Sequence, residues 1–194
     1  MHHIYHTHAF VLGNTNTGEA NKFLTLFTRE LGVVSAHVQG VRHLRSRLRF
    51  SLQDFSYAKV DLVRGKEIWR VTSAGKINEH EAILHNHEKR MFVANIFNLL
   101  RRLCPGEEVH EALYDDVQGM FTFLENESIP NEALDQAEII LVLRILYHLG
   151  YIAHGERTKD FILSPYSLEL ITSASTEKQS IVREINTALR ESQL

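Results

Sequence analysis

The sequence contains a single cysteine, Cys104, among its 194 residues. One cysteine excludes an intramolecular disulfide and a zinc site with four cysteine ligands. Because the chain cannot use disulfides, we expect a reducing, cytoplasmic environment. Cys104 lies beside Pro105, where its simplest role is that of a small buried apolar residue.

Long apolar runs are also missing. The longest, Ala137 to Tyr147, is interrupted by Glu138 and Arg144 and reaches only about half of the ~20 residues that a membrane-spanning helix needs. The first ten residues, MHHIYHTHAF, have neither the basic region nor the long apolar core of a secretory signal. The sequence therefore predicts no membrane association and no export.

Three motifs of nucleotide and hydrolase chemistry are absent as well. Gly65-Lys66 and Gly75-Lys76 lack the upstream glycine and the following hydroxyl of a phosphate-binding loop. The dinucleotide fingerprint GxGxxG and the nucleophile elbow GxSxG do not occur. The sequence therefore gives no support for nucleotide hydrolysis or for covalent serine catalysis.

Histidine, by contrast, is abundant, with 12 residues. His80 and His85 lie five positions apart, about 140° round a helix, whereas the zinc motif HExxH needs a spacing of four. The remaining clusters are His85 with His87, and His2, His3, His6 and His8. Solvated polar segments are the simpler interpretation, so we expect no metal. A histidine-dependent metalloenzyme is retained as an alternative.

Overall composition is that of an ordinary globular protein, with 44% hydrophobic residues and a net charge of minus 3. The charge is unevenly distributed. Residues 1–76 carry a balance of plus 6, and residues 77–194 carry minus 9. A basic half joined to an acidic half indicates that the first half meets a polyanion.

The basic half shows the short alternating pattern of β-strands. We expect strands at residues 4–12, 22–28, 33–39, 55–63 and 67–72, with a turn at Gly13 to Gly18 and a hairpin turn at Arg64-Gly65-Lys66. Five short strands favour a small closed barrel, because closure removes exposed edges.

The acidic half changes to helical spacing. Apolar residues mark one helix from Val93 to Leu103, stopped by Pro105-Gly106, and a second from Val109 to Leu124. A third, from Asn131 to Leu149, is apolar all round and should be the most buried. A last helix is expected to begin at the capping-box pattern of Thr176.

The most distinctive local signal is the arginine segment, Gly40 to Leu52, with the sequence GVRHLRSRLRFSL. It contains four arginines, and no acidic residue occurs from Val33 to Gln53. Arginine suits phosphates because its planar fork donates paired hydrogen bonds and stacks on bases. We expect a mobile cationic arm that binds nucleic acid through Arg42, His43, Arg45, Arg47 and Arg49. A solvated surface loop is the alternative.

Other residues of the barrel could join this site. Basic loops beside aromatic residues are typical of barrels that bind single strands. Base stacking is expected of Tyr57 and Trp69, although Trp69 could equally belong to the core. Further phosphate contacts are expected from Lys22, Lys59, Arg64 and Lys66.

Several short stretches together resemble RecO, the bacterial recombination mediator. They are AFVL at 9–12, GEA at 18–20, LTLFTRELG at 24–32, GVR at 40–42, SRLR at 46–49 and LQDFS at 52–56. The match is close over about the first 75 residues. The helical remainder, with Leu149-Gly150-Tyr151 at a helix end, agrees in pattern.

The resemblance implies an α+β protein, in which residues 1–76 form a DNA-binding OB-fold barrel and residues 77–194 an all-α domain for protein docking. It also implies a non-catalytic function in DNA repair. The protein would bind single- and double-stranded DNA and anneal complementary strands. With RecR, it would load RecA onto strands coated by single-strand binding protein, whose carboxyl-terminal tail would dock on it. Its location would be the cytoplasm, at the nucleoid.

Two departures from the family pattern affect these expectations. Many members carry a four-cysteine zinc ribbon after the Leu-Gly-Tyr position, but residues 152–165 contain no cysteine. We therefore expect a short metal-free hairpin there, or loss of the element. The first turn, commonly basic in the family, reads Asn14-Thr15-Asn16-Thr17. An RNA-binding OB module remains an alternative function.

Overall fold

The structure is a computed structural model that describes residues 3–104 and 106–191. It divides into two compact units. The barrel unit comprises Met1–Glu81 and Phe97–Glu111, and the helical unit comprises Ala82–Ile96 and Ala112–Leu194. The fold changes from strand to helix close to Lys76, but residues 97–111 belong to the barrel unit by their contacts. Among the described helices, none is long and apolar enough to cross a membrane.

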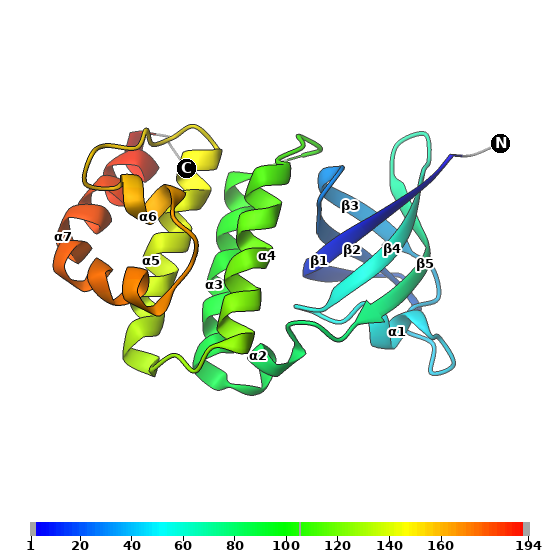
Figure 1. The fold of residues 1–194 in the computed structure, drawn as a ribbon. Helices are drawn as coiled ribbons and strands as arrows, with labels where there is room; N and C mark the ends of the chain where they lie inside the picture. The colour runs from blue at the N-terminus through cyan, green and yellow to red at the C-terminus, as the bar shows by residue number, and fades with distance from the viewer. Residues whose placement is uncertain (1–2, 105, 192–194) are drawn as a thin grey trace. The chain divides into compact units, whose positions relative to one another are not determined.

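Five strands close into a barrel in the order β1-β2-β3-β5-β4 (Figure 1). Neighbouring strands are antiparallel except β3 and β5, which pair in parallel at Ala36–Trp69 and His37–Arg70. This confirms the predicted OB-fold barrel followed by helices. The strands are β1 (Ile4–Thr17), β2 (Asn21–Thr28), β3 (Gly32–Val38), β4 (Tyr57–Arg64) and β5 (Trp69–Ile77).

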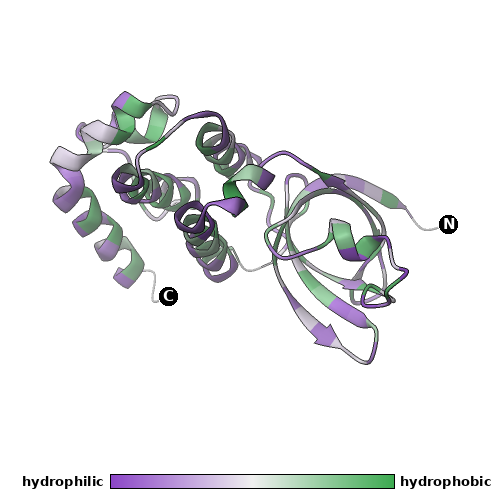
Figure 2. Ribbon diagram, turned by 90° about the horizontal axis from the view of Figure 1, so that it is seen from below, coloured by the Kyte–Doolittle hydropathy of each residue, from purple (hydrophilic) through white to green (hydrophobic). Residues whose placement is uncertain are grey.

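Strand alternation sorts the side chains between the barrel interior and its outer surface. In β3, Val34, Ala36 and Val38 are buried, whereas Ser35 is exposed, as the sequence predicts. The interior is filled by apolar residues from all five strands, together with Val41 and Leu52 from the connection after β3. This connection holds the short helix α1 (Leu48–Ser51), which lies across the opening of the barrel in Figure 2.

The first turn lies further along the chain than predicted. Residues Gly13 to Thr17 continue β1 and pair with β2 up to Thr17–Asn21, so the expected turn at Gly13 to Gly18 is wrong. The chain turns at Gly18, whose φ of 58° suits glycine. The polar residues before Gly18 stay in the strand because the ladder of β2 offers hydrogen-bond partners to their backbone.

The remaining helices confirm most of the predicted helical pattern. They are α2 (Glu81–His85), α3 (His87–Leu103), α4 (Glu111–Asn126), α5 (Asn131–His148), α6 (Lys159–Leu163) and α7 (Leu168–Glu191). Helix α5 buries residues on all sides, including Arg144, and contacts α6 and α7. Gly150, with φ 77°, follows its end. Pro105, the expected stop of α3, lies outside the described residues.

Two helical predictions are wrong. Helix α7 begins eight residues before Thr176, whose hydroxyl donates within the helix to the carbonyl of Ser173 at 2.8 Å. Its first turn is capped instead by Ser167, whose Oγ accepts from the Leu170 amide at 3.1 Å. Residues 152–165 form neither a hairpin nor a deletion, because they contain α6. Phe161 and Ile162 of this helix are buried, so apolar side chains anchor the segment.

Candidate nucleic-acid interface

The arginine segment is folded onto the barrel. Successive backbone hydrogen bonds run through it, from His43 N to Gly40 O at 3.1 Å and from Ser46 N to His43 O at 3.0 Å, and α1 follows. Leu52 closes α1 with a bond from its amide to Leu48 O at 3.0 Å. The segment expected to be a mobile arm thus has hydrogen-bonded turns, and Val41 and Leu52 anchor it in the barrel core.

The segment is also tied to the turn between β1 and β2. The Arg42 amide donates to Ala20 O at 2.9 Å, and its guanidinium donates to Gly18 O at 3.2 Å. The Gly40 amide donates to the Asn21 side chain at 2.8 Å. These bonds hold the cationic side chains beside the end of the β1–β2 hairpin.

The predicted cations of the segment face solvent. Arg42, His43, Arg45, Arg47 and Arg49 are all exposed. Among the residues that the structure describes, the four guanidinium groups form no ion pair with a carboxylate. Their charge is therefore available to an external anion.

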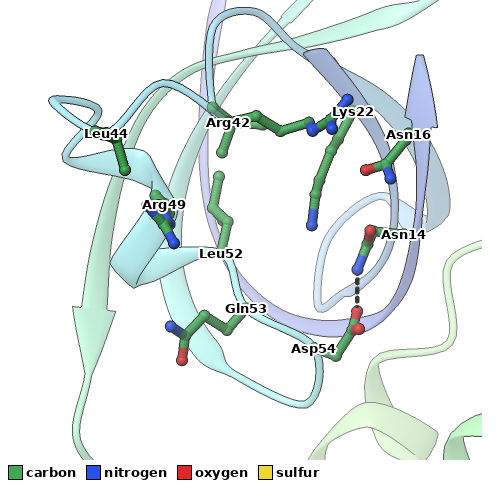
Figure 3. A pocket seen from close by; sticks show the side chains of 10 residues that line it. Asn14, Asn16, Lys22, Arg42, Leu44, Arg49, Leu52, Gln53 and Asp54 are labelled. Atoms are coloured by element: carbon green, nitrogen blue, oxygen red, sulfur yellow. Dashed lines mark hydrogen bonds between the residues drawn. The ribbon is translucent and has the colours of Figure 1, made fainter. Parts of the chain in front are cut away.

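A cavity of about 570 Å³ opens between the arginine segment and the strands (Figure 3). Three cationic side chains reach it from different elements: Lys22 from β2, Arg42 from the segment and Arg49 from α1. Its one acidic side chain, Asp54, accepts a hydrogen bond from Asn14. The other lining residues are Asn16, Val41, Leu44, Leu52 and Gln53. Cations and amide groups around one opening suit a phosphate-bearing ligand.

A β-bulge places two of these amides in the cavity. The register of β1 against β2 shifts between Val11 and Gly13, so that Asn14 pairs with Leu24 and Asn16 with Lys22. Leu24 lies in the barrel core, and cross-strand partners share a face. Without the residue that the bulge adds to β1, Asn14 would point to the outer surface. Sequence reasoning missed Asn14, Asn16 and Gln53, because the bulge and the fold of the segment depend on pairing.

The other predicted cations do not join this cavity. Lys59 is exposed on the outer surface of β4, between the inward-facing Ala58 and Val60. Lys66 lies in the β4–β5 turn, which adjoins the start of β1, whereas the cavity adjoins the end of β1. Arg64 pairs with Glu107 and covers the Trp69 ring at 5.2 Å. Of the four lysines and arginines expected outside the segment, only Lys22 lies at the cavity.

The end of the barrel near Arg64 is occupied by the acidic connection between α3 and α4. Gly106 O accepts from the Val33 amide at 3.1 Å, and Glu111 pairs with Arg29 at 3.3 Å. Gly32 packs closely against the backbone of Glu108. All these residues belong to the barrel unit. Carboxylates neutralise Arg29 and Arg64 at this end, in contrast to the exposed arginines of the segment.

The two rings expected to stack on bases are buried. Trp69 is 4% exposed, and its indole N–H donates to Glu107 Oε1 at 2.9 Å. Tyr57, also 4% exposed, stacks on Phe10 at 4.6 Å between ring centroids. Neither ring offers an open face, so their assignment to base stacking is corrected and Trp69 is a core residue.

The cysteine and the described histidines lie in different surroundings. Burial, with Glu108 nearby, raises the pKa of the Cys104 thiol to about 11, so it stays protonated at neutral pH. His6 lies 2.6 Å from Asp61 on the outer surface of the barrel. Across residues 3–104 and 106–191, no three histidine, cysteine or acidic side chains are grouped to hold a metal ion. His2 lies outside these ranges.

Comparison with known proteins identifies the barrel. Residues 1–79 match the family described as "Recombination protein O N terminal". Similar proteins include the DNA repair protein RecO of Heliobacterium modesticaldum, 34% identical over 102 residues, which are 53% of this chain and 37% of that protein. The protein of the same name from Dehalococcoides mccartyi strain CBDB1 is 28% identical over 72% of this chain and 55% of its own length.

A third relative, the DNA repair protein RecO of Thermodesulfovibrio yellowstonii, is 26% identical over 76% of this chain and 58% of its own length. The chain thus matches between 37% and 58% of the length of these three relatives. The family match covers the strands of the closed barrel, and the relatives extend the similarity into the helices. Residues 1–79 thus form an OB-fold barrel that matches the amino-terminal domain of the RecO family, and the chain is similar to RecO proteins beyond the barrel.

Proposed function

We propose that this chain is a mediator of recombinational DNA repair that binds single- and double-stranded DNA and anneals complementary strands. With RecR, it would load RecA onto strands coated by single-strand binding protein, in the cytoplasm at the nucleoid. It performs no covalent chemistry and needs no cofactor. Similarity to RecO proteins supports the repair function, and the arginine segment supports the mode of binding.

The observation that carries this proposal is the exposed, unpaired charge of the arginine segment. All four arginines of the segment are exposed, and two of them, Arg42 and Arg49, line the cavity together with Lys22. They would neutralise backbone phosphates and release counterions without reading the bases. When the charges of two polyanionic strands are screened, base pairing can drive annealing without an external source of energy.

The proposed contacts form a core and a periphery. The core consists of Arg42, Arg45, Arg47 and Arg49, with His43 and Lys22. Lys59 and Lys66 are exposed elsewhere on the barrel and would contact only the outer parts of a longer strand. Arg64 is left out because Glu107 holds its guanidinium.

The test replaces Arg42, Arg45, Arg47 and Arg49 by alanine in one variant. Labelled single-stranded DNA is titrated at several salt concentrations. Binding is expected to weaken, and the slope of log K against log salt is expected to fall by about 0.7 for each phosphate that the variant no longer neutralises. Annealing of complementary strands, followed by fluorescence, should slow in parallel.

A matched control removes the same amount of charge elsewhere. Arg102, Arg157, Arg183 and Arg190 are exposed on or beside helices, and their joint replacement by alanine should leave the salt slope unchanged. Equal weakening in both variants would show that net charge matters rather than the segment. Competition by RNA as strong as that by DNA would favour an RNA-binding module.

We further propose that residues 77–194 dock the protein partners, RecR and the carboxyl-terminal tail of single-strand binding protein. This assignment rests on the similarity to RecO proteins and on the separate compactness of the helical unit. Anisotropy of a labelled tail peptide, titrated with the full chain and with the quadruple arginine variant, is the test. Equal affinity in the two is expected. Loss of peptide binding in the arginine variant would place docking on the barrel instead.

A further inference from the structure

The two most exposed large hydrophobic side chains in the described part of the chain both lie in the arginine segment. Leu44 is 83% exposed and Phe50 is 63% exposed. Single exposed apolar residues are common on protein surfaces and need no explanation. Two of them within seven residues, among four arginines and without an acidic neighbour, form an unusual combination.

The exposure of Phe50 follows from the orientation of α1. Leu48 packs against the barrel core and Ser51 is buried, so this side of the helix faces inward. Phe50 lies about 160° round the helix from Leu48 and therefore faces outward. Folding of α1 does not require an aromatic residue there, because the ring makes no contribution to the core.

Leu44 adds apolar surface at the cavity itself. Its side chain lines the opening together with Arg42 and Arg49 (Figure 3). The segment therefore combines arginine side chains, which suit phosphates, with the exposed apolar side chains of Leu44 and Phe50. A surface of this kind matches a ligand that offers charge and an apolar face at once.

We infer that Phe50 stacks on an unpaired base of the bound strand, with Leu44 as a second apolar contact, while the arginines hold the phosphates. This inference rests on the proposed DNA binding. Unpaired bases expose their flat faces, whereas duplex DNA hides them, and stacking on aromatic side chains tolerates any base. Phe50 and Leu44 thus give a preference for single strands, in place of the buried rings of Tyr57 and Trp69.

The first experiment compares Phe50→Ala and Leu44→Ala with wild type on two oligonucleotides of equal length and charge, one normal and one with abasic central positions. Phe50→Ala should bind the normal strand about tenfold more weakly, while its affinity for the abasic strand and its salt slope stay unchanged. Leu44→Ala should show a smaller loss of the same kind. Tyr151→Ala and Leu163→Ala, exposed side chains of the helical unit, are the matched controls.

The outcomes separate this inference from the proposed function. Wild-type affinity of Phe50→Ala for the normal strand overturns the stacking contact, and so does an equal loss on both strands. In either case the quadruple arginine variant still tests phosphate binding. Failure of the wild-type protein to bind either strand would instead remove the proposed function.

A second variant keeps an aromatic ring and supplies a signal. Phe50→Trp should bind as tightly as wild type, and its fluorescence should be quenched by single-stranded DNA more than by duplex. The native Trp69 is buried and should give little change in the wild-type protein. Saturation with single-stranded DNA without quenching of the new tryptophan would overturn the inference.

Discussion

Asp116 accepts hydrogen bonds from three side chains in the helical unit. Arg144 Nη1 lies 2.9 Å away, His148 Nε2 3.0 Å and the Tyr166 hydroxyl 2.7 Å. Arg144 also donates to the carbonyls of Phe161 and Ser164, so this cluster ties the segment containing α6 to α4 and α5. A buried arginine needs such partners, since an unpaired buried charge is costly.

This network makes the stability of the helical unit sensitive to acid. Burial alone would raise the pKa of Asp116, but hydrogen bonds from His148 and Tyr166 and the charge of Arg144 outweigh it and lower the pKa. The stabilisation is therefore complete above the unfolded pKa of about 4 and is lost as pH falls through the lower folded value.

Asp116→Asn tests this network. At neutral pH it should destabilise the helical unit by about 3 kcal/mol, because Arg144 loses its carboxylate. The variant should also lose much of the acid dependence that we expect for the wild type in urea unfolding below about pH 5. Asp135→Asn, at an exposed pair with Lys178, is the control and should change stability by less than about 0.5 kcal/mol. Similar pH profiles for wild type and Asp116→Asn would contradict the prediction.

At the scale of elements, the two ends of the barrel have different covers. The acidic connection after α3 packs on one end, and the arginine segment with α1 packs on the other. Gly32 permits the connection between α3 and α4 to pack on the barrel. Its φ is 69°, and an added Cβ would lie 2.2 Å from the Glu108 carbonyl oxygen. A glycine is required there on both counts.

Gly32→Ala should therefore destabilise the barrel unit by about 2 kcal/mol or more, through backbone strain and displacement of the connection. Gly75→Ala is the matched control, since Gly75 in β5 has open space around its Cα and no positive φ. The measurement is denaturant unfolding followed by Trp69 fluorescence, because Glu107 of the same connection bonds to this ring. Equal stability of the two variants would show that the connection does not hold the barrel.

At the scale of the whole molecule, the net charge is minus 3, yet a polyanion is the proposed ligand. Local fields of the arginine segment would have to outweigh the repulsion from the acidic helices. Salt screens charges beyond a Debye length of about 10 Å at 0.1 M, so the contact surface dominates at moderate ionic strength.

Two consequences are expected for the intact chain. Oligonucleotides of equal length and different sequence should bind within about threefold of one another, because phosphate contacts carry no sequence information. The logarithm of affinity should fall linearly with the logarithm of salt concentration. Fluorescence anisotropy over a panel of sequences measures both, and strong selection of one sequence would contradict the proposed mode of binding.

Much of the architecture was predictable from local patterns. Alternation in β3 and the apolar spacing of α3 to α5 are properties of short stretches, and both are found in the structure. Such patterns reflect burial on one side of an element, which the chain encodes residue by residue.

Tertiary structure alone decided the rest. The bulge after Val11 turns Asn14 and Asn16 toward the barrel interior, and the indole N–H of the buried Trp69 bonds to Glu107, 38 residues away. The early start of α7 was hidden because a plausible cap at Thr176 preceded an apolar pattern. Whether a cationic side chain has a carboxylate partner also depends on residues far away in the sequence, as in the pair of Arg64 with Glu107. Pairing register and long-range contacts select among locally equivalent choices, and no short stretch of sequence contains that information.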